Sequence, residues 1–195
     1  MTGDEKKKRS KLRLVAGGKS RCARVGPVRI IAAPAQESPF PLEAVAAEED
    51  TWLVLSTDSR IIEQHDHPIR VMTEVWEAAP EKPGEVVVKP GRPLRLLAVV
   101  HDFNADPTFR EEWVASALDG IFEETARREL ASIGLPLLGT LHGTLQPAAF
   151  LALLETAIER AGAQAPERVW LILQEERYRE ILDILDASAG WRPTP

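Results

Sequence analysis

The fold is indicated most strongly by residues Ser132–Gly143, which read SIGLPLLGTLHG. The first seven residues, Ser132–Leu138, are mostly apolar, which predicts a strand that is buried on both faces. The next five, Gly139–Gly143, include two glycines, a threonine and a histidine, which predicts a turn. A helical pattern then begins at Pro147. A buried strand, a polar turn and a helix in this order are typical of an α/β protein with a largely parallel sheet.

The same alternation precedes this stretch. Leu94–Val100 is a nearly continuous apolar run, which predicts another buried strand. Residues 107–130 then place apolar side chains three and four positions apart, which predicts a helix with one buried face. We expect Asp106 to cap this helix and Pro107 to be its first residue. Its apolar stripe consists of Trp113, Val114, Ala117, Leu118, Ile121, Phe122, Ala126 and Leu130.

The alternation also continues downstream. The pattern predicts a helix over Pro147–Ala161 that ends near Gly162, and a strand over Arg168–Leu173. A last amphipathic helix is expected over residues 175–187. Its apolar side carries Tyr178, Ile181, Leu182 and Leu185. We therefore expect the strands at 94–100, 132–138 and 168–173 to be neighbours in a three-layer α/β domain, whose mixed, mostly parallel sheet has helices on both faces.

The first half of the chain predicts shorter elements. Val28–Ala33 is rich in β-branched residues and is expected to be a strand. Thr51–Ser56 is a short apolar run preceded by acids, which predicts a buried strand. Glu85–Lys89 contains three consecutive valines and predicts another strand. Residues 59–79 are ambiguous and are compatible with a helix that is broken at Pro68.

The parallel sheet indicates where a ligand would bind. In open α/β sheets, ligands lie beyond the carboxyl ends of the strands. The loops that follow Ser56, Val100, Leu138 and Leu173 are therefore the places where a site is expected.

Charge is distributed unevenly along the chain. The 195 residues carry a net charge of −6, yet residues 1–25 contain nine Lys or Arg and two acids. The acidic remainder argues against a broad nucleic-acid-binding face, because phosphate contacts need clustered positive charge. We expect residues 1–25 to be a flexible tail and residues 26–195 to be a single domain. Any contact with nucleic acid is expected through the tail residues Lys6-Lys7-Lys8-Arg9.

Cysteine usage and hydropathy give an expectation for location. The single cysteine, Cys22, excludes an internal disulfide, which fits a reducing compartment. No apolar run approaches the roughly 20 residues that span a bilayer, and no secretory signal follows the basic start. We expect a cytoplasmic protein without membrane association. Because Cys22 has no matching histidine nearby, an incidental thiol is favoured over a catalytic one.

Three stretches of the second half form an ordered series. Residues 84–101 contain a glycine-led strand, a short turn and an apolar strand that ends in His101. Residues 135–143 contain a strand and a glycine-containing loop, and residues 169–178 contain a strand followed by Tyr178. In order and spacing, this series resembles the macro domain family, whose fold usually holds ADP-ribose or a related nucleotide. The resemblance covers about half of the chain and implies a macro-like fold.

The resemblance implies that the loop at 139–143 faces the ligand. Glycines permit positive φ and close backbone approach, so successive N–H groups can surround a diphosphate. Thr140 can add a hydroxyl, and His142 can add a donor or a positive charge. The expected ligand-binding residues are Gly139, Thr140, Leu141, His142 and Gly143, together with Thr57 and Asp58 after the first buried strand. An ordinary strand-to-helix turn is the alternative interpretation of this loop.

The first half departs from the family pattern. A typical macro domain follows its early buried strand with an Asn-Ala-Asn element and then a glycine-rich loop. Here Ser56-Thr57-Asp58-Ser59 follows Trp52–Leu55, and residues 59–79 contain no glycine. The asparagine that hydrolytic members use to position the distal ribose is not visible. Asp50 is a candidate for the adenine-selecting aspartate of the family.

These features favour a binding module over an enzyme. The leading hypothesis is a divergent macro-like module that binds ADP-ribose or a related nucleotide phosphate. A ligand-free scaffold that acts through protein–protein contacts is the alternative, and an ADP-ribosyl hydrolase is the third.

Other chemical motifs receive little support. His65-Asp66-His67 is the only dense group of metal-ligand residue types, and a catalytic zinc site needs a third protein ligand and an open position. No partner motif is visible, so a solvated loop is favoured over a metal site. The sequence has no P-loop and no dinucleotide-type glycine motif, and no nucleophile elbow surrounds Ser56 or Ser59. We expect neither a metal nor a cofactor.

Overall fold

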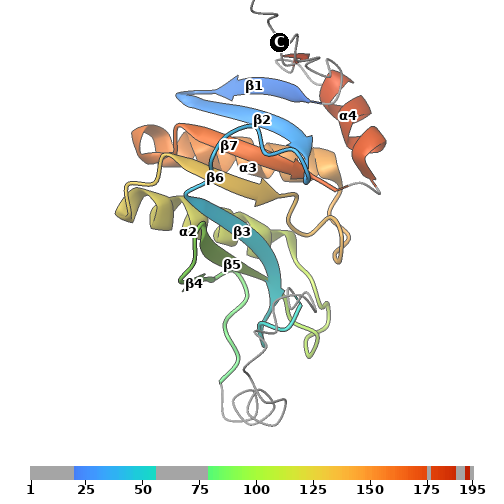
Figure 1. Ribbon diagram of the computed structural model, residues 1–195. Helices are drawn as coiled ribbons and strands as arrows, with labels where there is room; N and C mark the ends of the chain where they lie inside the picture. Colours follow the sequence, from blue (N-terminus) through green and yellow to red (C-terminus); the bar gives the residue numbers. More distant parts are fainter. Residues whose placement is uncertain (1–19, 56–78, 175–176, 188–191, 194–195) are drawn as a thin grey trace, which may run out of the picture.

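Apolar runs separated by turns place one eight-stranded sheet and three α-helices in the part of the chain that the computed structural model describes, residues 20–55, 79–174, 177–187 and 192–193 (Figure 1). The elements in chain order are β1 (Arg21–Val25), β2 (Val28–Pro34), β3 (Ala44–Asp50), β4 (Val86–Lys89), β5 (Leu94–His101), α2 (Glu111–Arg127), β6 (Ser132–Pro136), α3 (Pro147–Ala161), the 3-10 turn η1 (Gly162–Gln164), β7 (Arg168–Leu173), α4 (Tyr178–Ala187) and β8 (Arg192–Pro193).

The sheet is mixed and mostly parallel, as predicted. Its strand order is β4-β5-β3-β6-β7-β2-β1-β8. The five strands from β5 to β2 in this order are parallel to one another, and β4, β1 and β8 join antiparallel at the two sides. The three strands expected to be neighbours lie in this one sheet. However, β3 lies between β5 and β6, so only β6 and β7 are adjacent.

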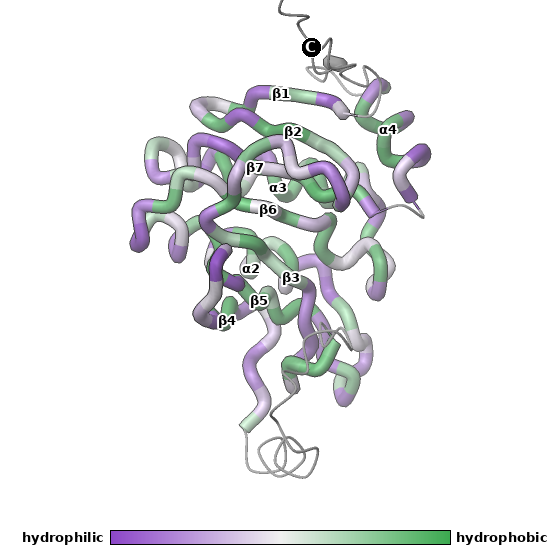
Figure 2. Tube along the Cα trace, in the orientation of Figure 1, coloured by the Kyte–Doolittle hydropathy of each residue, from purple (hydrophilic) through white to green (hydrophobic). Residues whose placement is uncertain are grey.

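The main core lies between the sheet and the three helices. It contains buried side chains from the strands and from α2, α3 and α4, with Leu118, Phe150 and Leu171 among the largest that are fully buried. In Figure 1, α2 and α3 lie side by side behind the sheet. Figure 2 shows that the central strands are mostly hydrophobic and that the turns beyond their ends are mostly hydrophilic. Burial of apolar surface in this layer is the main stabilising contribution to the fold.

The second face of the sheet carries a smaller cluster. Ile31, Ala33 and Trp170 are buried there, and Phe40 and Leu42 from the segment between β2 and β3 pack against them. The indole Nε1 of Trp170 donates a hydrogen bond to the carbonyl of Ala33 at 3.1 Å. Helices were expected on both faces. Among the described residues, the helices contribute to the main core only.

The helices have the buried faces that the periodicity predicts. In α2, Val114, Ala117, Leu118, Ile121 and Phe122 are buried. The outer members of the predicted stripe, Trp113, Ala126 and Leu130, are only partly buried, and Leu130 follows the end of the helix. The bounds predicted for α3 and β7 are confirmed, and Gly162 ends α3.

The start predicted for α2 is wrong. The helix begins at Glu111 with Arg110 as its N-cap residue, and Asp106 does not cap it. The intervening segment stays with the sheet instead: Phe109 forms a β-bridge with His101, and the amide of Asp102 donates to the carbonyl of Thr108 at 2.9 Å. Tertiary hydrogen bonds therefore outweigh the local capping signal.

The buried strand predicted at Thr51–Ser56 was also assigned to the wrong residues. The strand is Ala44–Asp50, and Thr51–Leu55 forms a turn after it. Leu53 has a positive φ of 56° in this turn, and Val54 is 47% exposed. Alanine has a low strand propensity, but β3 pairs with β5 along its whole length and with β6 at Ala44 and Val45. Pairing inside the sheet therefore decides the assignment.

The predicted tail contains a strand. Residues 21–25 form β1, which pairs with β2 and with β8, and Cys22 is partly buried in it. The assignment of these residues to a flexible tail is therefore wrong. Residues 1–19 lie outside the described residues, and the boundaries of a single domain stay a prediction. No helix in the described part of the chain has the length and apolar character needed to cross a membrane.

Candidate functional site

The carboxyl ends of β3, β5 and β6 bring three loops together at one edge of the sheet. β3 pairs in register with β5 up to Asp50 and His101, and β6 lies on the other side of β3. Their loops are residues 51–55, 102–110 and 137–146. This is the edge at which ligands of parallel α/β sheets bind. We call it the carboxyl edge.

A carboxylate joins two of these elements. Glu48, near the end of β3, places its Oε1 2.5 Å from the Nε2 of His101 on β5. Its Oε2 accepts a hydrogen bond from the backbone amide of Gly139 at 2.8 Å. The side chain of His101 is 1% exposed and that of Glu48 is 10% exposed, so the arrangement is almost fully enclosed. A buried carboxylate needs such partners because burial without them is costly.

Two further acids are buried beside Glu48. The Oδ1 of Asp50 accepts from the amide of Trp52 at 2.6 Å, and its Oδ2 accepts from the amide of Val54 at 3.3 Å. Glu49 accepts from the amide of Leu55 at 3.0 Å. These carboxylates hold the turn after β3 through its backbone donors. Asp50, the candidate for recognition of an adenine, therefore directs both carboxylate oxygens to its own turn.

The glycines of the 139–143 loop are required by packing. Gly139 has a φ of +74°, and a Cβ there would lie 2.5 Å from a ring carbon of Phe109 and 3.1 Å from Val114. A Cβ on Gly143 would lie 2.5 Å from the carbonyl oxygen of Gly139. Both positions thus exclude a side chain for reasons within the protein.

The remaining residues of the loop differ in their exposure to solvent. Thr140 is buried, and its hydroxyl donates to the carbonyl of Leu137 at 2.8 Å. Leu141 and His142 are exposed. Within the described part of the chain, the backbone amides of Leu141, His142, Gly143 and Thr144 have no hydrogen-bond acceptor. Four successive backbone donors are therefore available in this segment.

A positive charge supports this loop. The Nη1 of Arg177 donates to the carbonyl of Thr140 at 2.7 Å. Two other nitrogens of the same guanidinium bind the carboxylate of Glu180, at 3.0 Å and 2.8 Å. The hydrogen bond with Glu180 raises the pKa of Arg177 above its ordinary value, so the guanidinium stays charged.

Exposed apolar side chains surround the loops of the carboxyl edge. Val54, Phe103 and Leu141 are 47%, 54% and 45% exposed, and they are the large hydrophobic side chains most exposed in the described part of the chain. Each lies in a different loop. The ring of Phe103 is stacked on that of His101, with centroids 5.7 Å apart and planes 7° from parallel. His142 faces the same histidine edge-on at 6.4 Å. Such a rim can cover an apolar ligand surface.

The structure places the predicted loop at the carboxyl edge, as expected. Thr57, Asp58 and the histidines of His65-Asp66-His67 lie outside the described residues. Among the residues that are described, no group of three metal-ligand side chains gathers at one point. Glu48, His101 and Phe103 were not predicted as site residues. For His101 a signal existed, because it ends the apolar strand on which the resemblance rests.

Comparison with known proteins rests on structure alone. No protein-family model matches the sequence, and no curated protein matches it. Solved structures do match. The Oceanobacillus iheyensis macrodomain with ADP superimposes with a TM-score of 0.61 at 16% identity, over 86% of this chain and 97% of that one. The chain has the macro domain fold.

Two other macrodomain structures agree with this conclusion. A variant of the Oceanobacillus iheyensis macrodomain with ADPR gives a TM-score of 0.59 at 15% identity, over 87% of this chain and 100% of that one. The macrodomain of Thermus aquaticus DarG gives 0.53 at 18% identity, over 74% and 97%. The macro-like fold that the sequence resemblance implied is therefore confirmed.

The described residues that follow the early buried strand carry no Asn-Ala-Asn element. β3 is the early buried strand, and it ends in Ala47-Glu48-Glu49-Asp50. The described residues that follow this strand, Thr51–Leu55, contain no asparagine.

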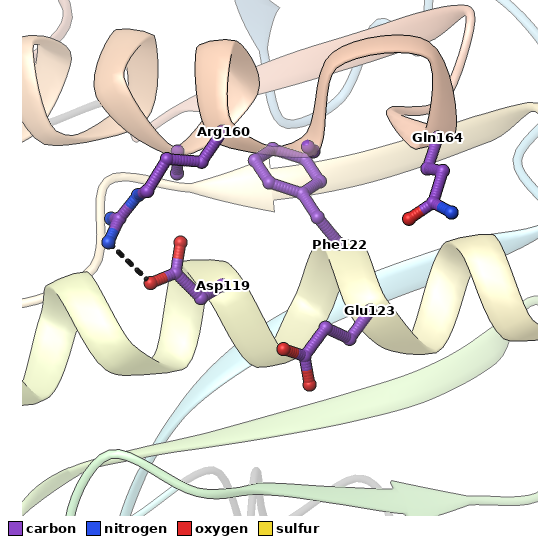
Figure 3. Close-up of a pocket in the computed structure, with 7 residues that line it drawn as sticks. Asp119, Phe122, Glu123, Arg160 and Gln164 are labelled. Carbon is purple, nitrogen blue, oxygen red and sulfur yellow. Dashed lines mark ion pairs between the residues drawn. The ribbon is translucent and has the colours of Figure 1, made fainter.

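Two hollows lie at the opposite edge of the sheet. One of about 260 Å³ lies between α2 and α3, with Phe122 extending from α2 toward α3 and Asp119 paired to Arg160 at 2.9 Å (Figure 3). A second, of about 550 Å³, adjoins it beside Ala131 and Glu167, which directly precede β6 and β7. Both are at the amino ends of the strands, where α/β proteins do not usually bind ligands.

Proposed function

We propose that this chain is a macro-like module that binds ADP-ribose or a related nucleotide phosphate at the carboxyl edge. The observation that carries the proposal is the set of four successive amides, those of Leu141, His142, Gly143 and Thr144, which have no acceptor in the described part of the chain. Backbone amides of this kind bind phosphate oxygens, because each donates a charge-assisted hydrogen bond to the anion. The nearby charge of Arg177 supports the same role.

The apolar rim supports the nucleoside part of the ligand. Phe103 presents a half-exposed ring that is already stacked on His101. Aromatic faces of this kind stack on nucleobases. Two of the structural neighbours were solved with ADP or ADPR. We propose the same ligand class for this chain, with phosphate on the loop and an apolar or aromatic group against the rim.

Isothermal titration calorimetry with ADP-ribose, ADP, AMP and adenosine tests this proposal. We expect at least one phosphate-bearing ligand to bind more tightly than adenosine. Leu141→Pro removes one of the four amide donors and is expected to weaken binding by roughly tenfold, the value of one charge-assisted hydrogen bond. Leu141→Ala is the matched control, because it shortens the same side chain and keeps the N–H.

Folding of both variants is checked by thermal denaturation. Equal affinities of Leu141→Pro and Leu141→Ala would show that the amides do not hold the phosphate. Absence of binding by wild type to all four ligands at millimolar concentration would remove the nucleotide proposal.

A protein-binding scaffold is the second candidate. Val54, Phe103 and Leu141 expose apolar surface from three loops at one edge, which also suits a protein partner. This candidate leads if no nucleotide binds. It predicts that Phe103→Ser abolishes capture of a partner while nucleotides have no effect on that capture.

A further inference from the structure

Three arginines from neighbouring strands form a row across the second face of the sheet. The pairing register places Arg24 of β1 opposite Arg29 of β2, and it places Arg29 beside Arg168 of β7. Residues paired in this way share a face, and adjacent strands lie about 4.8 Å apart. The face is the second one, because Ile31 and Trp170, two positions further along the same strands, belong to its cluster. We call Arg24, Arg29 and Arg168 the arginine row.

No acid neutralises the arginine row within the described part of the chain. None of the three guanidinium groups forms an ion pair or a hydrogen bond there. The Nε of Arg168 is buried without a partner, and its Cζ lies 5.2 Å from the centroid of the Phe40 ring. Glu43, which precedes β3 two strands away, directs its carboxylate to the amides of Ala131 and Ser132 instead. The positive charges of the row are therefore uncompensated.

Such a row is unfavourable for the fold by itself. Like charges directly opposite each other on neighbouring strands repel and destabilise a sheet. Arg24 and Arg29 are exposed and Arg168 is partly buried, so none of them is required to fill the core. Residues that lower stability without a structural gain are typical of binding surfaces. An anion that bridges the row would remove the repulsion, which makes an anionic ligand the simplest explanation.

We propose that the arginine row binds the phosphate backbone of a single-stranded nucleic acid. The guanidinium group presents a planar fork of donors that matches phosphate oxygens. The row extends over roughly 10 Å, two inter-strand spacings, so it can contact successive phosphates of one strand. The partly exposed ring of Phe40, with the Arg168 guanidinium over it, suits the stacking of a base. An acidic peptide would use the charges but not this stacked pair.

The position of the row separates it from the proposed nucleotide site. Arg29 and Arg168 lie at the amino ends of β2 and β7, away from the carboxyl edge. The proposal therefore goes beyond the proposed function and does not depend on it. The chain has a net charge of −6, which argues against a broad basic face for a duplex. A narrow row of cations can still follow a single strand.

Fluorescence anisotropy with a labelled oligouridylate of about 12 nucleotides at low salt tests the proposal. Arg29→Glu changes the centre of the row at an exposed position. We expect wild type to bind the oligonucleotide and Arg29→Glu to bind it at least about tenfold more weakly, because the variant loses one phosphate contact and repels the strand.

Stability distinguishes lost binding from lost folding. A glutamate between Arg24 and Arg168 replaces repulsion with attraction, so we expect the melting temperature of Arg29→Glu to equal or exceed that of wild type. Arg29→Gln is a second variant in case the charge reversal disturbs the fold. It is expected to reduce the slope of log affinity against log salt concentration by roughly 0.7, the value of one phosphate contact with a single strand.

Arg92→Glu is the matched control. Arg92 is exposed in the turn between β4 and β5, at the opposite side of the sheet from β1. The substitution changes the net charge by the same amount as Arg29→Glu. Both variants keep the basic run Lys6-Lys7-Lys8-Arg9, so any contribution of that run is the same in each. We expect the affinity of Arg92→Glu for the oligonucleotide to match that of wild type.

Four outcomes would overturn the proposal. The first is an absence of oligonucleotide binding by wild type, and the second is an equal loss of affinity in Arg29→Glu and Arg92→Glu. The third is equal binding of a polyglutamate peptide of the same charge, which would show that the row accepts any acidic chain. The fourth is displacement of the oligonucleotide by excess ADP-ribose, which would place the strand at the carboxyl edge.

Discussion

The two edges of the sheet use charged side chains in opposite ways. At the carboxyl edge, Glu48, Glu49 and Asp50 are largely or fully buried, and backbone amides or a histidine partner their oxygens. At the amino edge, Arg160 and Asp119 form an ion pair whose side chains are 53% and 32% exposed. Burial of a charge is costly unless it is fully partnered, whereas an exposed pair costs and contributes little.

The two edges also differ in the kind of polar groups that they present. Two hollows lie at the amino edge, where the ion-paired side chains of Arg160 and Asp119 are partly exposed. At the carboxyl edge, buried polar groups are positioned by three separate strands and their loops. Precisely held polar groups with free donors beside them are what a binding site requires.

The largest expected loss of stability comes from a substitution in the core, which both edges share. Leu118 on α2 is fully buried against the sheet. We expect Leu118→Ala to reduce the free energy of unfolding by about 2–5 kcal/mol, because it removes apolar contacts and leaves a cavity. Urea denaturation measures this loss and sets the scale for the edge substitutions. A loss smaller than that caused by either edge substitution would show that the core is not the dominant contribution.

An intermediate effect is expected at the carboxyl edge. Asp50 is fully buried and accepts from the amide of Trp52 at 2.6 Å. Asp50→Ala removes the acceptor of this amide and is expected to cost about 1–3 kcal/mol. Asp50→Asn, which keeps one acceptor oxygen, should cost less. Faster amide hydrogen exchange at residues 52–55 in Asp50→Ala would confirm that the turn loosens, and unchanged exchange would contradict the role assigned to this carboxylate.

The smallest effect is expected toward the amino edge. Partial burial raises the pKa of Glu124, but hydrogen bonds from Arg127 and Arg128 outweigh it, so the pKa lies below its ordinary value. The stabilisation is therefore present above the unfolded-state pKa and is lost as the pH falls through the lowered one. Because the side chain of Glu124 is 22% exposed and that of Arg127 is 62% exposed, screening limits the effect.

We expect Glu124→Gln to reduce stability by less than about 1 kcal/mol at pH 7. The difference from wild type should shrink below about pH 4.3, the ordinary glutamate pKa. Thermal denaturation across pH 3–7 measures both. A loss as large as that of Asp50→Ala would remove the contrast between the two edges.

Much of the second half of the fold could be predicted from periodicity. In α3 the apolar spacing is regular and Pro147 and Gly162 mark its ends, so local signals agree with the tertiary structure. β7 is a continuous apolar run with buried residues on both faces, and its bounds were also predicted correctly. These elements show that a strong local pattern is sufficient where nothing competes with it.

β3 could not be predicted in this way. Its sequence, AVAAEED, combines alanines with acids, which by themselves suggest a solvated loop. The neighbouring run Trp52–Leu55 looked more like a strand but became a turn. Glu48 escaped notice for a related reason. Its partners, His101 and Gly139, are 53 and 91 residues away, and no local pattern reveals such a contact.

The position of β7 also affects the order in which the sheet can be completed during synthesis. β7 lies between β2 and β6, and Val169 pairs with Ile30 on one side and with Ile133 on the other. The hairpin of β1 and β2 and the block of β3 to β6 are therefore made first, yet no strand pairing among the described residues links them directly. Each leaves an open strand edge until residues 168–173 leave the ribosome, and open edges invite pairing with other chains. The nascent chain thus depends on its last long strand to close both edges at once.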